Sequence, residues 1–343
     1  MQALFYSPNP LTQSEIIIAL EILGKKLSSI TEEDSLIKKA QIENQWFTPQ
    51  WQLFAFNYWA GQLNQANLNH WVANYQFTNN PKKVGLIMAG NIPLVGMHDL
   101  ISILISGNIA LVKSSSDDKT LTPWIIEQLI LIDPRFKEKI IEVEKLNSCE
   151  ALIATGSNNT ARYFEYYFSK VPKIIRKNRN SIAVLSGNET NEELGGLADD
   201  IFSYFGLGCR NVSKLMVTEN YDFQRFFEAL EKYKESVNHN KYYNNYTYHK
   251  ALFLMNIAPH FDNGFLILKE DKKIASPLGC IFYSVYKERN DILEFIDLNR
   301  ENIQIVIGNP NYIKECISFG QSQNPKIDDY ADDMDTMKFL NQL

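Results

Sequence analysis

One of the four cysteines of the chain stands in a setting that suits a nucleophile. Cys209 lies in the stretch YFGLGCRNVSKLMV, between the end of an expected helix and a strand-like run. Catalytic groups concentrate on such loops, and the neighbouring Gly206 and Gly208 allow the close backbone approach that an oxyanion site needs. The adjacent Arg210 favours a thiolate. A free cysteine without this context is more often a small buried residue, so Cys209 is a candidate nucleophile.

Further polar groups stand where apolar runs end. Asn91 follows the run VGLIMAG, and its amide can donate to a developing oxyanion, although a turn asparagine is the simpler interpretation. Lys113 ends the run IALVK, where a lysine can meet the ribose or phosphate of a cofactor or merely be solvated. Gly156 and Ser157 precede a helix N-terminus, which favours anions. None of these is the GxGxxG motif of a dinucleotide fold, so each by itself is weak evidence for a cofactor or oxyanion site.

The elements that would position these groups alternate along the chain. Residues 1 to about 80 have helical apolar spacing, and Pro93 is expected to open a helix that runs to about Ser106. Thr190 and Glu193 form a capping box at the start of another helix. The segment NHNKYYNNYTYHK is expected to be a linker or a surface helix. Two series of strand-like runs alternate with helices, which predicts an α/β fold with doubly wound, mostly parallel sheets and ligands at the carboxyl ends of strands. The runs are VGLIMAG, IALVK, IIEVEKL, EALIAT and SIAVLSG, then SKLMVT, FLILKE, CIFYSVY and IQIVIGN.

Composition narrows the classes of function. The net charge of −6 argues against nucleic acid as the main partner. The histidines and cysteines show no metal-ligand spacing, so no metal site is expected. No apolar run is long enough to span a membrane. The opening MQALFYSPNPLTQSE lacks a basic region and a long apolar core, so we expect no secretory leader and a cytoplasmic protein with reduced thiols.

Taken together and in order, the motifs resemble those of the aldehyde dehydrogenase superfamily. The order is strand, Gly-Asn-x-Pro, helix, Gly-Asn, strand and Lys, then Thr-Gly-Ser before a helix, then Gly-x-Gly-Cys. The short chain, the helical start, AGNIPLVG and GLGCRNVSK look most like the LuxC-type acyl-CoA reductases, which reduce acyl thioesters to aldehydes with a nicotinamide cofactor. The resemblance implies a helical segment plus nucleotide-binding domain over residues 1–205, a catalytic domain over 206–343, and an active site in the cleft between them.

The resemblance also implies roles for single residues. Cys209 matches the catalytic cysteine of the family, and Asn91 matches its oxyanion asparagine. Leu94, Met97 and His98, which follow Asn91, are candidates for the wall of an acyl tunnel, although such residues are more often plain core. The positions that match the cofactor site are Lys113, Ser115, Ser116, Thr155, Gly156, Ser157 and Leu278.

Two departures from the family pattern bear on the reaction. Many aldehyde-oxidising members use a Glu-Leu-Gly-Gly glutamate as the base for a hydrolytic water. Here EELGG, Glu192–Gly196, is expected inside a helix, and the corresponding segment 174–180 has no carboxylate. An acyl-CoA reductase needs no such base. Ser116, with Ser115 before it, stands where many NAD-preferring members have a glutamate, and its neutrality removes repulsion against a 2′-phosphate.

The sequence therefore predicts an NADPH-dependent acyl-CoA reductase that forms an aldehyde through a thioester on Cys209. The alternatives are an NAD(P)-dependent aldehyde dehydrogenase and a non-catalytic dinucleotide-binding or scaffold protein of the same fold. Acyl-CoA or another acyl thioester is the expected substrate, and an acyl-transferring partner protein is a candidate source of it. The hairpin through which larger members oligomerise has no counterpart between Gln76 and Val84, so the oligomeric state, a homo-oligomer included, stays open.

Overall fold

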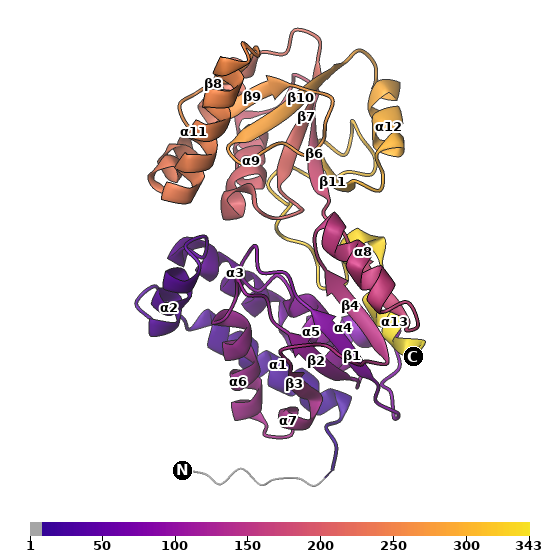
Figure 1. Cartoon of the computed structure of the whole chain (residues 1–343). Helices are drawn as coiled ribbons and strands as arrows, with labels where there is room; N and C mark the ends of the chain where they lie inside the picture. The colour runs from indigo at the N-terminus through magenta and orange to yellow at the C-terminus, as the bar shows by residue number, and fades with distance from the viewer. Residues whose placement is uncertain (1–8) are drawn as a thin grey trace. The chain divides into compact units, whose positions relative to one another are not determined.

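The chain forms two compact units in a computed structural model that describes residues 9–343. One unit contains the chain up to Lys177 together with Lys326–Leu343, and the other contains Asn178–Pro325 (Figure 1). The first eight residues belong to the segment expected to be helical and to the stretch considered for a leader, and they lie outside the described residues.

The N-terminal part of the first unit is helical, as its apolar spacing predicts. A capping box of Thr12 and Glu15 starts the first helix, whose apolar stripe is buried in the core of the unit. Pro49 occupies the first turn of the third helix, where its missing N–H costs no hydrogen bond. The helices are α1 (Gln13–Ser28), α2 (Ser35–Glu43), α3 (Pro49–Gln62) and α4 (Gln65–Val72).

A five-stranded parallel sheet follows in the same unit. Its strands are β1 (Lys83–Ile87), β2 (Ile109–Lys113), β3 (Ile140–Glu142), β4 (Ala151–Thr155) and β5 (Lys173–Arg176), in the order β3-β2-β1-β4-β5. The strand β5 has no counterpart among the predicted strands, because a run of four residues is too short to show a pattern. No strand lies between α4 and β1 in the described chain, where larger relatives are expected to have a hairpin.

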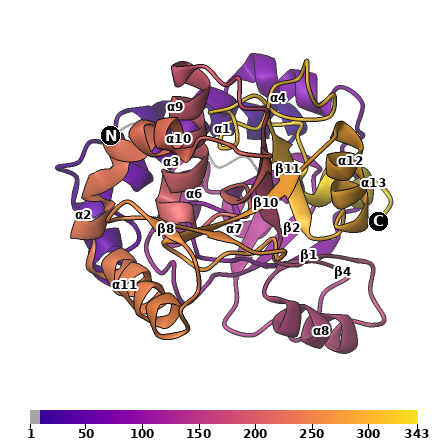
Figure 2. The same cartoon turned by 90° about the horizontal axis from the view of Figure 1, so that it is seen from above.

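The direction of each crossover decides which face of this sheet a helix covers. The helices α5 (Met97–Ile105), α6 (Leu121–Ile132) and α7 (Phe136–Lys139) belong to the steps from β1 to β2 to β3, and α8 (Asn158–Tyr167) belongs to the opposite step from β4 to β5. Right-handed crossovers therefore place α8 on the other face. Figure 2 shows α8 across the sheet from α1 and α4.

The helix α5 begins later than Pro93, where the sequence predicts its start. Leu94 has a φ of +57°, in the left-handed region. A right-handed helix cannot continue through such a residue, so Asn91–Gly96 forms turns and the helix starts at Met97.

The second unit holds a six-stranded sheet that is parallel except at one edge. The order is β11-β6-β7-β10-β9-β8, and only β8 runs antiparallel to its neighbour. The strands are β6 (Asn180–Leu185), β7 (Val212–Thr218), β8 (Phe261–Asp262), β9 (Ile267–Glu270), β10 (Cys280–Tyr286) and β11 (Ile303–Ile307). Two mostly parallel, doubly wound sheets confirm the predicted α/β fold.

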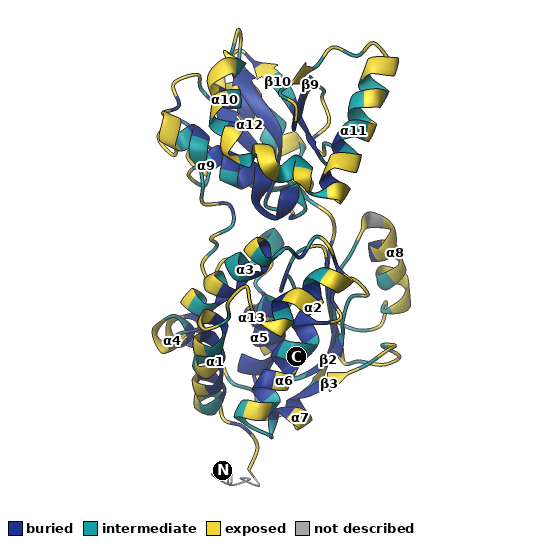
Figure 3. Ribbon diagram, turned by 90° about the vertical axis from the view of Figure 1, so that its left-hand side faces the viewer, coloured by how far each residue is buried: buried dark blue, intermediate teal, exposed yellow. Residues whose placement is uncertain are grey.

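Four α-helices accompany this second sheet. They are α9 (Asn191–Phe202), α10 (Phe223–Leu230), α11 (Asn240–Met255) and α12 (Arg289–Leu298). The predicted capping box of Thr190 and Glu193 starts α9. The Asn- and Tyr-rich segment forms α11, a surface helix that buries Tyr242 and Tyr246 and exposes its outer face (Figure 3).

The boundary of the units differs from the expected one between residues 205 and 206. The strand β6 pairs with β7 and β11, so residues from Asn178 onward belong to the second unit. The C-terminal segment returns to the first unit, where Ile327, Met337 and Leu340 are buried in its core. This segment contains the short helices η3 (Ala331–Asp333) and α13 (Thr336–Asn341).

The two adjacent glycines of α9 provide a test of this packing. A Cβ at Gly196 would lie 2.9 Å from the backbone nitrogen of Gly320, whereas a Cβ at Gly195 would meet nothing within 4 Å. Gly196→Ala should therefore lower the free energy of unfolding by about 1–3 kcal/mol through overpacking. Gly195→Ala, its control, should be neutral or stabilise by up to about 1 kcal/mol through helix propensity. Urea unfolding of both variants measures the difference, and equal values would contradict the packing.

The described residues contain neither a membrane-spanning helix nor a metal-binding cluster. No helix in residues 9–343 is long and apolar enough to cross a membrane. In the same part of the chain, no group of three or more His, Cys, Asp and Glu side chains is arranged to hold a metal ion.

Candidate functional site

The loop between α9 and β7 presents one accessible thiol. All four cysteines lie in the described part of the chain, and of these only Cys209 is exposed. Burial raises the pKa of the Cys280 thiol to about 12, and it also raises the pKa values of Cys149 and Cys316. Because the thiolate is the reactive form, these three thiols are poor nucleophiles and Cys209 is the accessible one.

Hydrogen bonds from within the loop and from other segments hold the chain around Cys209. The N–H of Gly208 donates to Asn211 Oδ1 at 2.8 Å, and Ser181 Oγ donates to the carbonyl of Cys209 at 2.9 Å. Next along the chain, Arg210 Nε donates to the carbonyl of Ser322 at 2.5 Å. The main chain of the loop is thus fixed while the sulfur is exposed.

The segment that meets Arg210 is itself held by α9. Asp200 is buried, and its carboxylate accepts the N–H groups of Gly320 and Ser322 at 2.7 and 3.0 Å. Burial raises the pKa of Asp200. The close approach of Gly196 to Gly320 belongs to the same contact. The helix that precedes the cysteine therefore also positions the carbonyl that binds the neighbouring arginine.

A left-handed turn leads into the cysteine loop. Tyr204, Phe205 and Gly206 have φ values of 51°, 58° and 80°. The first two carry side chains, for which this region is unfavourable. Leu278, predicted at the cofactor site, lies near the turn, since its Cδ1 would be 3.8 Å from a Cβ added at Gly206. The structure thus brings Leu278 to the base of the loop that carries Cys209.

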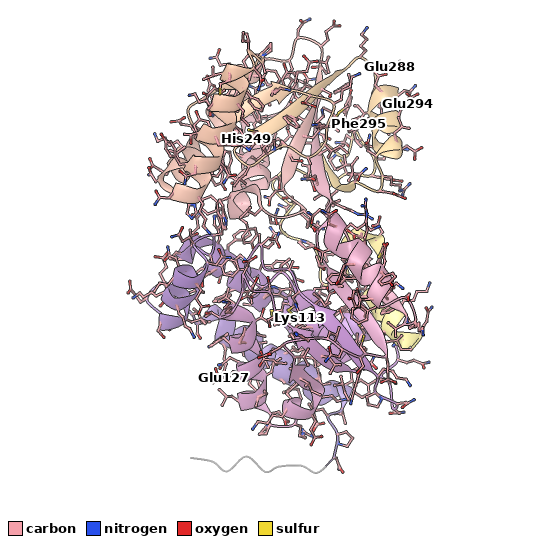
Figure 4. The ribbon with its side chains drawn as sticks, in the orientation of Figure 1. Lys113, Glu127, His249, Glu288, Glu294 and Phe295 are labelled. Carbon is pink, nitrogen blue, oxygen red and sulfur yellow. The ribbon has the colours of Figure 1, made fainter. Side chains whose placement is uncertain are left out.

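The predicted polar groups of the first unit gather at one edge of its sheet. Asn91 follows β1, Lys113 ends β2 and Thr155 ends β4. These strands are parallel neighbours in the order β2-β1-β4, so their carboxyl ends meet at the same edge. Lys113 is labelled in Figure 4. Such an edge is where open α/β sheets bind ligands.

The loop after β2 carries three consecutive serine hydroxyl groups, those of Ser114, Ser115 and Ser116. Ser114 Oγ is buried without a hydrogen-bond partner among the described residues. A Cβ at Gly90 would lie 2.6 Å from Ser115 Oγ, so glycine lets the ends of β1 and β2 approach each other. Ser116 is exposed. Beside a lysine, these hydroxyl groups are donors of the kind that bind ribose and phosphate oxygens.

The turn after β4 adds a helix N-terminus to the same edge. The N–H of Gly156 donates to the carbonyl of Arg176 at 3.1 Å, which joins the turn to the end of β5. Ser157 is the N-cap of α8, and its hydroxyl accepts the N–H of Thr160 at 3.2 Å. A helix N-terminus favours negative charge. The residues at this edge therefore fit a dinucleotide cofactor.

The three residues predicted to line an acyl tunnel are divided between two places. Leu94 and Met97 are buried and line one small apolar pocket with Met88 and Ile125. His98 lies elsewhere, with its Nε2 2.9 Å from the carbonyl of Ile327. Burial lowers the pKa of His98. The pocket has space for no more than about one water molecule, so an acyl group does not fit in it, and His98 does not line it.

The end of β5 carries a buried ion pair, in the segment that the family resemblance matches with the base of aldehyde-oxidising members. Arg176 NH1 donates to Asp99 Oδ2 at 2.5 Å, and Arg176 NH2 donates to Thr336 Oγ1 at 2.8 Å. Both charged side chains are more than 90 % buried. Within residues 174–180 there is no carboxylate, and the carboxylate of Asp99 already binds the arginine. The EELGG motif, Glu192–Gly196, lies inside α9, as the sequence predicts, and not at the end of β5.

The comparison with protein families decides the relationship. The profile of the LuxC acyl-CoA reductase family matches residues 66–238, half of the chain, including Asn91 and Cys209. The chain belongs to the LuxC acyl-CoA reductase family. The predicted family is thereby confirmed, and the protein is an oxidoreductase of the LuxC kind. No curated protein matches its sequence.

Solved structures share the fold of this LuxC-family protein at low sequence identity. An oxidoreductase from Marinobacter aquaeolei is similar with a TM-score of 0.70 and 11% identity, over 96% of this chain and 82% of that one. An NAD-dependent aldehyde dehydrogenase from Sinorhizobium meliloti gives 0.67 and 11%, over 90% and 74%. Betaine aldehyde dehydrogenase from Staphylococcus aureus, in complex with NAD+, gives 0.63 and 12%, over 87% and 70%.

The sequence of this LuxC-family chain singles out Cys209 as the candidate nucleophile but does not reveal the residues that hold its loop. Ser181 and Ser322 form hydrogen bonds to the loop from parts of the second unit that are distant in sequence, and Asn211 forms one within the loop. Only Asn211 could have been noticed from the sequence, because it is a polar residue two positions after the cysteine and directly before an apolar strand. The other two become neighbours of the loop only in the folded chain.

Proposed function

We propose that this acyl-CoA reductase works through a covalent thioester on Cys209, with Asn91 as the oxyanion donor and NADPH as the reductant. The observation that carries the proposal is the exposure of Cys209 alone among the four thiols, on a loop whose backbone is held on both sides of the cysteine. Nucleophilic catalysis needs both an accessible thiol and a fixed backbone.

In the first half of the proposed reaction, the thiolate of Cys209 bonds to the carbonyl carbon of the acyl thioester. The bond from that carbon to the sulfur of CoA breaks, and CoA leaves as a thiol after taking a proton from water. The side-chain amide of Asn91 and the N–H of Cys209 donate to the oxygen that becomes negative in between. The same step accepts an acyl group from CoA, from a carrier protein or from an acyl-transferring partner.

The second half uses the carboxyl edge of the first sheet. Lys113, Ser115 and Ser116 hold the ribose and phosphate groups of the cofactor, and Thr155, Gly156 and Ser157 form the turn beside its nicotinamide. NADPH, when bound, supplies the hydride that converts the acyl group on Cys209 to the aldehyde. Leu278 packs at the base of the loop on the cofactor side. The thiolate of Cys209 is released with the product.

A comparison of the two directions of reaction tests this proposal against the aldehyde dehydrogenase alternative. Acyl-CoAs of several chain lengths with NADPH should cause loss of reduced cofactor and formation of aldehyde. In the other direction, aldehyde with NADP+ should turn over slowly until CoA is added, because residues 174–180 supply no carboxylate to activate water. Fast formation of acid without any thiol would overturn the proposal. Cofactor binding with no turnover in either direction would support the non-catalytic alternative.

The proposed preference for NADPH has its own test at the loop after β2. Ser116→Glu should shift the ratio of kcat/KM for NADPH over NADH by about tenfold or more toward NADH. A carboxylate about 4 Å from a phosphate is repelled by about 1–4 kcal/mol in water or near a protein surface. Ser116→Gln, similar in size but neutral, should leave the ratio nearly unchanged. Equal or better use of NADH by the unmodified protein would contradict the preference.

A further inference from the structure

Asn211 lies between the cysteine loop and β7 and is almost completely buried. Its side chain is 2% exposed. The carboxamide of Asn211 is engaged in hydrogen bonds with the main chain, so it has no group free to act on the acyl carbonyl. Any role in the reaction must therefore pass through the backbone that it binds.

The carboxamide of Asn211 joins the end of α9 to the residue before the cysteine. Its Nδ2 donates to the carbonyl of Asp200 at 3.0 Å and to the carbonyl of Ser203 at 2.9 Å. Its Oδ1 accepts the N–H of Gly208 at 2.8 Å. The last carbonyls of a helix have no partner within the helix, so the donors of Asn211 satisfy groups that would otherwise be buried without a hydrogen bond.

These hydrogen bonds bracket the left-handed turn. Ser203 precedes the turn and Gly208 follows it, while Tyr204 and Phe205 have the positive φ values. A left-handed conformation of residues with side chains persists only where surrounding contacts over-determine it. The bonds of Asn211 to both ends supply such contacts, so the path of the chain into Cys209 depends on this side chain.

We propose that Asn211 is the positioning residue of the nucleophile. By binding Gly208 N–H and the carbonyl of Ser203 together, it fixes the peptide from which the thiol and the N–H of Cys209 project. The inference rests on the proposed role of Cys209 and adds a residue that touches neither substrate nor cofactor. Loss of Asn211 should therefore slow acylation without weakening the binding of acyl-CoA.

The first experiment measures the rate at which acyl-CoA, without NADPH, acylates Cys209 in a single turnover, per folded molecule. Asn211→Ala should lower this rate by about 10- to 100-fold, a part of the loss expected for a whole oxyanion donor. In steady state, kcat should fall while KM for acyl-CoA stays within about threefold. Binding of NADPH, followed by its fluorescence, should be unchanged.

Asn108→Ala is the matched control for a merely structural effect. Asn108 is also almost fully buried, at 1% exposed, and its side chain likewise accepts a backbone N–H, that of Lys82, at 2.9 Å. It lies at the start of β2, at the end of the strand opposite to Lys113. The control should lose stability yet acylate Cys209 at the normal rate per folded molecule.

A second variant keeps the test decisive if Asn211→Ala does not fold. Asn211→Asp preserves the shape and the acceptor for Gly208 N–H, but its ionised form cannot donate to Ser203. Burial favours the protonated acid, which can donate one hydrogen bond. The acylation rate of Asn211→Asp, relative to the unmodified protein at the same pH, should therefore rise as the pH falls from 8 to 6.

The outcomes separate this inference from the proposed function. A normal acylation rate in Asn211→Ala, or in Asn211→Asp at every pH, would overturn the positioning role while leaving Cys209 as the nucleophile. A rise in KM with unchanged kcat would also overturn it. If Cys209→Ala reduces acyl-CoA normally, the proposed function itself fails.

Discussion

Cys209→Ala should abolish the reduction of acyl-CoA, with a loss of at least about 10⁴-fold, the scale for removal of a covalent nucleophile. The unmodified protein, incubated with acyl-CoA but without NADPH, should accumulate one acyl group. The first half of the reaction does not need the cofactor, and hydrolysis of the thioester should be slow where no carboxylate serves as base. Mass spectrometry of the intact protein and of its peptides should place the acyl mass on Cys209, and hydroxylamine or added NADPH should remove it.

The other thiols are the controls for this result. Burial raises the pKa values of Cys280 and Cys316, so neither is expected to form a thiolate near neutral pH. Cys280→Ala and Cys316→Ala should therefore keep both the labelling and the reduction per folded molecule. Acylation of any peptide other than that of Cys209, or a normal rate in Cys209→Ala, would show that the assigned nucleophile is wrong.

Asn91→Ala should slow the acylation of Cys209 by roughly 10²–10³-fold, the usual loss for one oxyanion donor. Asn91 lies four residues after the last residue of β1, at the edge of the sheet where Lys113 ends β2. The rate of the single acylation step, measured by rapid quench with acyl-CoA alone, reports this loss directly. The affinity for NADPH should change little, because the proposed role of Asn91 is on the acyl carbonyl.

Asn91→Asp sharpens the test of this donor. The substitution keeps the shape of the side chain but replaces the donating amide with a carboxylate, which repels a developing oxyanion. The variant should acylate at least as slowly as Asn91→Ala at pH 7. If Asn91→Asp retains most of the rate, the side chain acts only through its packing and the oxyanion role is wrong.

The sequence by itself determined the family, the class of fold and the order of most elements. Continuous apolar runs such as IALVK predict buried parallel strands, because both faces of such strands are covered, and β2 has that burial. Local signals also sufficed for the helix that contains Glu192–Gly196, since Thr190 and Glu193 satisfy each other's backbone N–H groups within one turn. Cys209 stood out for the same reason: its glycine neighbours and the following strand are adjacent in sequence.

The features that depend on long-range contacts were decided only by the tertiary structure. The strand β5 is recognised by its pairing with β4, not by its four residues, and Leu94 adopts the left-handed conformation that delays α5. The last residues of the chain return to the first unit because Ile327, Met337 and Leu340 find their apolar partners there. The hydrogen bonds of Asn211 to Asp200 and Ser203 likewise join residues that no local pattern connects. Burial and hydrogen bonding between segments distant in sequence are properties of the folded chain, and they set the position of Cys209.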